Sequence, residues 1–388
     1  QNYTTSGLDY SYGPQKKENR LLTLYANYNK LVEPIKSSFD VTAGYDYQYW
    51  KATNPLYSEM NTLGEVLKTS KATDERHVLL SYYGRLNYSF DSRYMLTTTV
   101  RRDATSRFAK NVRWGTFPSV ALGWRVTEES FLKNNKVLSN LKVRASYGVT
   151  GQQDGIGNYN YLPIYTISQN GAESIMGNDY IYTYRPKSYV SDLKWETTIT
   201  RNIGLDFTIL GGKLNGSIEA YLNTTKDLLI QFPVSGTGYD YQYRNMGETQ
   251  NKGIEATLNW TAIDKKNFGL SFSANIGFNK NKIKDLGIMN DFGAETYWAS
   301  SEIGYDFWIA KGGAVGKMYG YRSAGRYEVS DFEGYDATSK KWILKEGVTD
   351  ASAVVGTLRP GMMKLQNIDG SEDNKVTSDD REIIGNAN

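Results

Sequence analysis

Apolar and polar side chains alternate along much of the chain, and this period of two is the pattern of a β-strand with one apolar and one polar face. In residues 37–50 the apolar face carries Phe39, Val41, Ala43, Tyr45, Tyr47 and Tyr49. The opposite face carries Asp40, Thr42, Asp46 and Gln48. A strand of this length extends over roughly 45 Å, which exceeds the apolar band of an outer membrane, about 25 Å, even when the strand is tilted.

The same alternation predicts nine further strands, at residues 21–31, 77–90, 94–103, 114–126, 141–150, 195–210, 213–223, 251–260 and 269–279. Pro118 lies inside one of them and has no N–H to donate, so we expect a bulge or a local break in pairing there. Aromatic residues near the strand ends are candidates for the interfacial girdles of a membrane barrel. They are Tyr47, Tyr49, Tyr94, Trp124, Trp195 and Trp260.

The connections between these strands are alternately short and long. The short links are residues 32–36, 91–93, 211–212 and 261–268, and the long ones are residues 51–76, 151–194, 224–250 and the segment after Asn279. Residues 104–113 are only moderately long for an outer loop, and residues 127–140 are long for a turn, with a short helix expected at 128–133. The pattern predicts an all-β chain that forms part of a large antiparallel up-and-down transmembrane β-barrel with long extracellular loops.

Composition narrows the class of protein. The 388 residues include no Cys and one His, which excludes disulfides, thiolate metal sites and any site needing two His from this chain. A formal net charge of +3 argues against a nucleic-acid partner. Mean hydropathy is -0.55, and no apolar run is as long as a membrane-spanning helix, roughly 20 residues. The content of 31 Tyr and 37 Gly is consistent with strands that each have one face in contact with water.

Several motifs carry a family resemblance. Residues 100–125 read VRRDATSRFAKNVRWGTFPSVALGWR. Further motifs are Ser146-Tyr147-Gly148 with Gly151-Gln152, Leu193-Lys194-Trp195-Glu196-Thr197-Thr198, Arg244-Asn245-Met246-Gly247, Asn251-Lys252-Gly253-Ile254-Glu255 and Asp380-Arg381-Glu382-Ile383-Ile384-Gly385-Asn386. In these motifs and in their order, over most of its length, the chain resembles the SusC/RagA-like branch of TonB-dependent outer-membrane transporters.

The resemblance implies a bacterial outer-membrane barrel of about 22 strands with a plugged lumen. It implies import of bulky nutrients, oligosaccharides or peptides, with a SusD-like surface lipoprotein as the lid and the TonB complex as the energy source. Residues 1–388 would then be a partial barrel domain, with the plug and its TonB-contacting segment expected before Gln1 and the last strands after Asn388. Open strand edges in lipid leave backbone groups unsatisfied, so we expect this chain to fold only with those parts.

Charged residues with the polar parity of their strands are candidates for contact with the plug or for lining the substrate path. They are Asp40, Asp46, Arg85, Arg101, Asp103, Lys142, Arg144, Asp206, Glu219 and Glu255. The alternative for any one of these residues is that it only faces the water-filled interior of the barrel.

Three tyrosine clusters in the long loops are candidates for substrate binding, because an aromatic ring can stack on a sugar while its hydroxyl forms a hydrogen bond. They are Tyr159, Tyr161 and Tyr165, then Tyr180, Tyr182 and Tyr184, then Tyr239, Tyr241 and Tyr243. The alternative is packing among the loops or against the lid lipoprotein. The spacing does not distinguish a glycan from a peptide.

Residues 367–380 are similar to a calcium loop, in which oxygen ligands alternate around a sharp turn. The candidate ligands are Asn367, Asp369, Asp373 and Asp380. Two extra residues interrupt the motif, and Asn374 replaces its Gly. The alternative is a solvated acidic turn, which calorimetry with calcium on the intact protein would distinguish. No other cofactor is expected.

The sequence offers no catalytic constellation. His77 is the only His, residues 312–317 fail the P-loop spacing, and Met318 replaces the Ser or Thr that binds magnesium. The adjacent Glu128 and Glu129 diverge on a helix or a strand. We therefore expect a transporter and no enzyme.

Two other functions remain open from the sequence. One is a soluble β-sandwich that binds carbohydrate or mediates adhesion, in which the apolar strand face would be buried against a second sheet. The other is a passive porin, which would conduct without TonB.

Overall fold

The computed structural model describes residues 8–10, 15–60, 63, 65–70, 72–133, 135, 137–167, 173–177, 179–182, 184–186, 188–233, 241–295, 305–371 and 373–386. The chain divides into two compact units. The first contains Gln1–Met246 and Lys252–Phe278, and the second contains Gly247–Asn251 and Asn279–Asn388.

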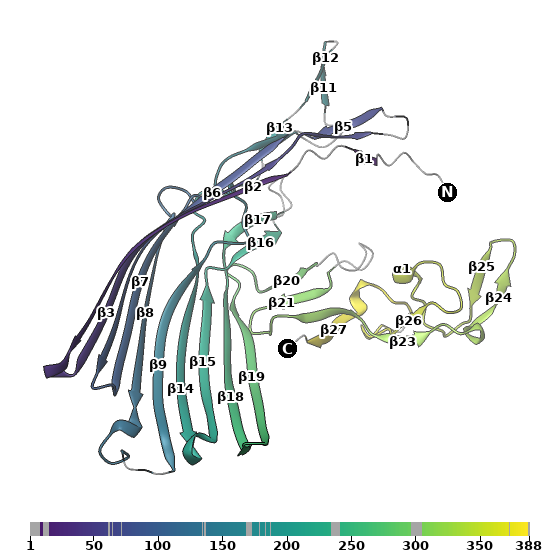
Figure 1. Cartoon of the computed structure of the whole chain (residues 1–388). Coiled ribbons are helices and arrows are strands. Elements are labelled where there is room, and N and C mark those ends of the chain that lie inside the picture. The colour runs from purple at the N-terminus through teal and green to yellow at the C-terminus, as the bar shows by residue number, and fades with distance from the viewer. Residues whose placement is uncertain are drawn as a thin grey trace. The chain divides into compact units, whose positions relative to one another are not determined.

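Ten long strands form one antiparallel sheet in the order β19-β18-β15-β14-β9-β8-β7-β6-β3-β2 (Figure 1). Their bounds are Lys16–Val32 (β2), Ser37–Asn54 (β3), Thr73–Phe90 (β6), Tyr94–Thr105 (β7), Trp114–Arg125 (β8), Leu138–Gln152 (β9), Glu196–Ile209 (β14), Leu214–Lys226 (β15), Glu248–Lys265 (β18) and Phe268–Asp285 (β19). These are the ten predicted strands, most of them longer than predicted. Each is paired with the long strands that precede and follow it in sequence, so the predicted up-and-down order is confirmed.

The register of the sheet keeps the apolar side chains of neighbouring strands on one face. The pairing of β3 with β6 runs without a shift from Ser37 opposite Phe90 to Asn54 opposite Thr73, and a fixed register fixes the face of every side chain. Large apolar side chains on this face are exposed on all ten strands: Leu24, Val41, Tyr82, Val100, Leu122, Tyr147, Ile203, Ile218, Leu258 and Phe272. A soluble sandwich would bury them, so that alternative is contradicted.

Short links join the strands at one end of the sheet. They include three-residue 3-10 turns at Glu33–Ile35, Val126–Glu128 and Leu210–Gly212. Backbone hydrogen bonds join neighbouring links, from Asp91 N to Lys36 O at 2.7 Å and from Arg125 N to Arg93 O at 2.8 Å. The helix predicted at 128–133 is wrong, because the 3-10 turn is followed only by tight turns. Leu132 N and Lys133 N both donate to Glu129 O at 2.9 Å, and no further hydrogen bonds continue this turn into a helix among the described residues.

Pro118 marks a local break in pairing, as predicted. It lies opposite Val100 of β7 with no shift in register. On its other side, β8 pairs with β9 only from Ser119 onward. The outer ends of β8 and β9 are therefore free to diverge.

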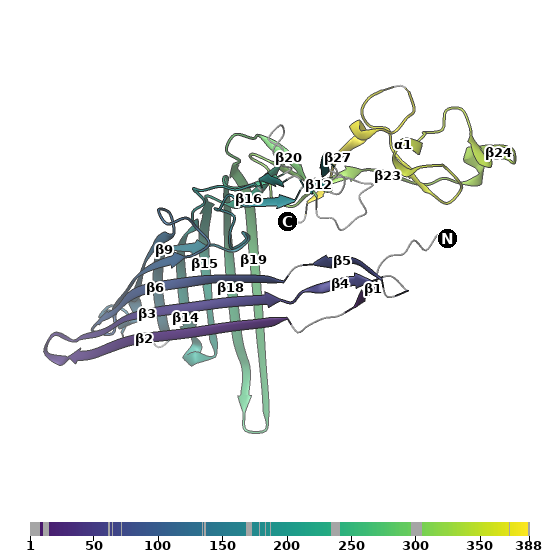
Figure 2. The same ribbon diagram turned by 90° about the horizontal axis from the view of Figure 1, so that it is seen from above.

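The long connections, and the segment before β2, carry short strands that the alternation did not predict. They are Leu8–Tyr10 (β1), Tyr57–Met60 (β4), Val66–Ser70 (β5), Tyr165–Ile167 (β10), Glu173–Met176 (β11), Asp179–Tyr182 (β12), Tyr184–Pro186 (β13), Leu229–Pro233 (β16) and Tyr241–Asn245 (β17). The β4–β5 hairpin prolongs the β3–β6 pair beyond the sheet (Figure 2). Runs of three to five residues are too short to show a period.

The second unit has its own strands and core. Its strands are Asp291–Ala294 (β20), Phe307–Ala310 (β21), Lys317–Tyr321 (β22), Ser323–Arg326 (β23), Phe332–Asp336 (β24), Lys341–Leu344 (β25), Met363–Leu365 (β26) and Arg381–Asn386 (β27). The short helix Ser352–Val355 (α1) and 3-10 turns at Val329–Asp331 and Ser378–Asp380 complete it. Its buried core contains Tyr327, Phe332, Ala351, Leu358, Leu365 and Val376. In the described part of the chain, no helix is long and apolar enough to cross a membrane.

Candidate functional site

The polar face of the sheet carries an arginine-centred group on β3, β6 and β7. The Arg101 guanidinium donates to Asp103 at 2.9 Å and to Ser81 Oγ at 2.8 Å, and it lies 3.4 Å from an oxygen of Asp46. It also lies over the ring of Tyr83, 5.6 Å from the centroid. One guanidinium faces two carboxylates here, which leaves a formal charge of -1.

A second group of the same composition lies on β9, β14 and β15. Arg144 donates from Nε to Asp206 at 3.1 Å and forms an ion pair with Glu219. Gly204 lies opposite Arg144 in the register, and a Cβ there would meet the guanidinium. Half-exposed ion pairs contribute little stability, about 0–1 kcal/mol each, so both groups matter mainly for the charge they present on this face.

A hollow of about 460 Å³ lies on the sheet and is lined by residues of β2, β3, β6, β7, β8 and β9, among them Arg144 of the second group. The acidic side is lined by Asp40, which accepts a hydrogen bond from Asn27 at 2.7 Å. The opposite side is lined by Arg144, whose charge is offset by Asp206 and Glu219, and by Lys142. Lys142 forms no ion pair with the residues that the structure describes, so it supplies the positive charge of the hollow. The hollow thus offers opposite charges at its two sides.

Eight of the ten predicted polar-face residues therefore belong to the two groups or to the hollow. Arg85 lies opposite Thr42 and Thr99, and Glu255 lies beside Gly277 of β19. Neither of these two joins a group among the described side chains. Tyr83, Ser81 and Asn27 are the contributors that sequence reasoning missed. All three occupy polar-face positions in the alternation of their strands, and this was the sequence signal that could have identified them.

Several of the family motifs come together in one buried core at the loop ends of β8, β9 and β14, hereafter the loop core. It contains Phe108, Phe117, Ile156, Leu193, Trp195 and Leu229. The indole of Trp195 contacts Phe108 and Phe117 edge-on, at 5.6 and 5.3 Å between centroids, and its Nε1 donates to Arg113 O at 2.9 Å. Trp195 was expected in a membrane girdle, and this is wrong because it precedes the first residue of β14 and turns into the loops instead.

Two glycines make room for Phe117 in the loop core. A Cβ on Gly115 or on Gly151 would overlap the Phe117 ring. The ring therefore fills the space where β8 and β9 no longer pair. Nearby, Asn245 closes three loop segments by donating to Lys194 O and Asp227 O and accepting from Lys194 N, at 2.8–2.9 Å.

The loop tyrosines divide into packed and exposed ones. Tyr243 packs against the loop core, and the Tyr159 hydroxyl accepts a hydrogen bond from Arg76 N at 3.4 Å. Tyr161 is half-buried, whereas Tyr165 and Tyr184 are exposed. Tyr239 lies outside the described residues, and the side chains of Tyr180, Tyr182 and Tyr241 are not described either. Substrate contact by these tyrosines stays a prediction.

The loop at 367–380 is closed by its own hydrogen bonds. Asp380 is buried and accepts from the backbone N–H groups of Ile368, Asp369 and Thr377 at 2.6–3.0 Å. Asn367 Nδ2 donates to Asp373, which also accepts from Lys375 N. Asn374 adopts a positive φ of 54°, as the replaced glycine would. Among the described residues no group of three or more His, Cys, Asp or Glu is placed to hold a metal ion, and calcium binding stays a prediction.

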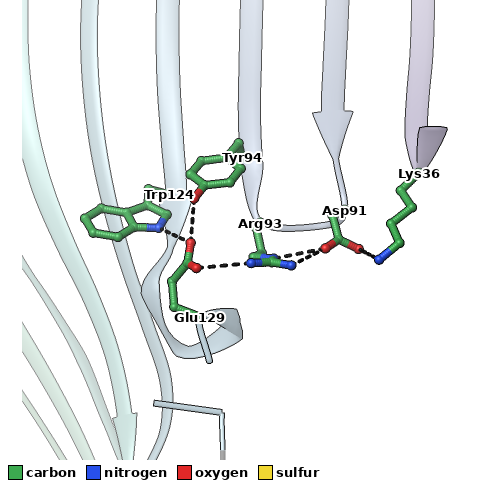
Figure 3. Close-up of polar contacts among 6 residues, drawn as sticks. All are labelled: Lys36, Asp91, Arg93, Tyr94, Trp124 and Glu129. Carbon is green, nitrogen blue, oxygen red and sulfur yellow. Dashed lines mark hydrogen bonds and ion pairs between the residues drawn. The ribbon is translucent and has the colours of Figure 1, made fainter. Parts of the chain in front are cut away.

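The residues that superficially suggested catalysis lie in structural contacts or in a turn. His77 lies directly opposite Trp50, and their rings stack at 4.5 Å. Residues 312–316 form the turn between β21 and β22. Glu129 binds Arg93, Tyr94 and Trp124 (Figure 3).

Comparison with known proteins supports the fold and the family. The family of TonB dependent receptor-like β-barrels matches residues 1–355. The TonB-dependent receptor SusC of Bacteroides thetaiotaomicron is 41% identical over 274 residues, which is 67% of this chain and 27% of that protein. The TonB-dependent receptor P3 of Formosa agariphila is 30% identical over 95% of this chain and 36% of its own length. The chain thus spans about a quarter to a third of these relatives.

A solved structure shows the same fold. The structure of the RagAB peptide transporter superimposes with a TM-score of 0.71 at 22% identity, over 95% of this chain and 38% of that one. The sheet order, the exposed apolar face and the family match agree with one another. The chain belongs to the TonB-dependent receptor-like β-barrel family of the outer membrane.

Proposed function

We propose that this chain supplies wall strands and outer loops of an outer-membrane active transporter that imports bulky nutrients, oligosaccharides or peptides. The observation that carries the proposal is the two-faced sheet. One face exposes large apolar side chains on all ten strands, and the other carries ion pairs and a charged hollow. Lipid solvates the first face and water the second in a barrel of this class.

The polar face is our candidate for contact with a plug domain. The hollow between Asp40 and Lys142 offers one negative and one positive side. A plug segment with complementary charges would fit there, and a SusD-like lipoprotein would close the outer mouth above the loops. The proposed mechanism is gating, in which TonB exerts force on the plug. It therefore requires no covalent chemistry from these residues.

The test uses the full-length protein in its own bacterium. A strain that lacks the gene should lose growth on one defined glycan or peptide, and a gene copy should restore it. The matched control is a copy without the TonB-contacting segment, which should not restore growth. Uptake that persists with this control, or after collapse of the proton gradient, would contradict active transport and favour a passive porin.

A further inference from the structure

The side-chain amide of Asn367 lies at the centre of the loop between β26 and β27. Its Nδ2 donates to Ser371 Oγ at 3.2 Å, to Asp373 Oδ1 at 3.3 Å and to Lys375 O at 3.1 Å. These acceptors are a hydroxyl, a carboxylate and a backbone carbonyl. A single NH2 group thus draws together three oxygens of the described part of this loop.

The neighbouring contacts require the nitrogen of this amide, and not its oxygen, to face inward. The Ser371 hydroxyl donates its own hydrogen to Asp373 Oδ1 at 3.0 Å, so only its lone pairs are left for Asn367. A carboxylate and a carbonyl can only accept. An inward amide oxygen would meet these oxygens without a hydrogen between them, and only a cation would relieve the repulsion.

The same oxygens are those that a calcium loop presents to its ion. In the common calcium loop, alternating side chains and one backbone carbonyl supply the ligands, and a glycine lies directly before the residue with that carbonyl. Asp373 and the Lys375 carbonyl hold two of these places, and Asn374 holds the glycine position with a φ of 54°. The loop therefore gathers these oxygens as a calcium loop does, but around a nitrogen.

The other two acidic residues of the motif are committed to backbone N–H groups. Asp369 Oδ1 accepts from Ser371 N at 2.7 Å. Both carboxylate oxygens of Asp380 accept from backbone N–H groups, at 2.6–3.0 Å. A calcium ion takes about six to eight oxygen ligands. Among the described carboxylates only Asp373 contacts Asn367, so these residues do not fit calcium unless existing hydrogen bonds break.

The loop is tied to the core of the second unit directly after these contacts. Asp350 N donates to Asn374 O at 2.7 Å, and Val376 N donates to Asp350 O at 2.8 Å. Val376 is fully buried in that core. The conformation around Asn367 therefore sets the position of a core residue shortly before β27 begins.

We propose that the Asn367 amide takes the place of a cation in this loop, so that the loop at 367–380 closes without calcium. The amide supplies two N–H bonds to the converging oxygens, where a calcium loop would supply an ion. Asn367 is a positioning residue, because it acts by fixing Asp373 and the Lys375 carbonyl. The inference goes beyond the transport function proposed above and does not depend on it.

The first test compares the full-length protein in detergent with excess EGTA and with calcium at about 10 mM, which would saturate even a weak extracellular site. Hydrogen exchange is followed at the amides of Asp350, Lys375 and Val376, which report on the loop and on its tie to the core. We expect equal protection in the two solutions. Higher protection with calcium would overturn the proposal, because the loop would then be an ion site.

The second test exchanges the central donor for an acceptor. Asn367→Asp places a second carboxylate against Asp373, whereas Asn374→Asp adds the same charge on an exposed side chain and is the matched control. We expect protection of the three amides to fall about tenfold in N367D with EGTA, because repulsion replaces a hydrogen bond to a charged acceptor. Calcium should restore it, and N374D should keep the protection of the unchanged protein.

The outcomes of this second test are distinct. Full protection of N367D in EGTA would overturn the role of the amide. A loss that calcium does not reverse, or an equal loss in N374D, would overturn the replacement of a cation. If N367D does not fold, N367A removes the donor without adding charge, and unchanged protection in N367A would likewise overturn the proposal. Each readout is local to this loop, so none of these results bears on the proposed transport.

Discussion

Single residues decide how the outer loops are held on the wall. Phe117 crosses the space that Gly115 and Gly151 leave open, and Trp195 packs edge-on against Phe117. All four residues belong to motifs that carry the family resemblance. Packing in the loop core therefore accounts for these four motif residues.

Gly151→Ala should destabilise the loop core, because the new Cβ would overlap the Phe117 ring. Overpacking of this kind costs about 1–3 kcal/mol. We expect a lower unfolding temperature of the full-length protein in detergent and faster proteolysis of the loops at 153–195. Gly148→Ala in the same strand is the control, since its Cβ would lie 3.4 Å from Ser119 Cβ in ordinary contact. Equal effects of the two substitutions would contradict the role of Gly151.

At the scale of elements, the second unit is organised by hydrogen bonds to a buried carboxylate. Burial by itself raises the pKa of Asp380, but the backbone N–H groups of Thr377, Ile368 and Asp369 outweigh it and leave that pKa below its usual range. The 3-10 turn Ser378–Asp380 then leads directly into β27. Asp380 thus fixes the start of the strand that pairs with β22.

Asp380→Asn should loosen the loop at 367–380, because an amide cannot accept three N–H bonds as a carboxylate does. Hydrogen bonds to a charged acceptor contribute about 1.5–3 kcal/mol. We expect lower hydrogen-exchange protection of the Ile368, Asp369 and Thr377 amides in the full-length protein. The exposed Asp379 provides the control substitution, Asp379→Asn.

The same carboxylate predicts a pH dependence. Its pKa in the folded protein is below the unfolded value of about 3.9. Its contribution is therefore complete above about pH 4 and is lost as the pH falls through the lower folded pKa. Protection factors of the three amides should fall in that acid range and should not change between pH 6 and 8. A loss of protection near neutral pH would contradict this assignment.

At the scale of the whole molecule, the ten-stranded sheet has β2 and β19 at its edges. The apolar side chains of β19 are prominently exposed, among them Phe272, Ile276 and Phe278. An unpaired strand edge in hydrocarbon costs several kcal/mol per unsatisfied backbone group. Both edges are therefore expected to pair with further strands in the membrane.

Residues 1–388 expressed alone should not give a stable monomer without detergent, because one sheet face is apolar and both edges are open. Size-exclusion chromatography would measure the oligomeric state and circular dichroism the strand content, with the full-length protein in detergent as the control. A detergent-free, monodisperse monomer with native strand content would refute the expectation.

The sequence alone determined the strands, their order and the two faces, because alternation with period two is a local property that a fixed register carries across the sheet. It could not place Trp195 or the Arg101 and Arg144 groups. Trp195 lies one residue before its strand, where parity no longer applies, and each arginine group joins residues far apart in sequence. Only the tertiary structure decided these contacts, because they depend on which strand ends diverge and which side chains the pairing brings opposite each other.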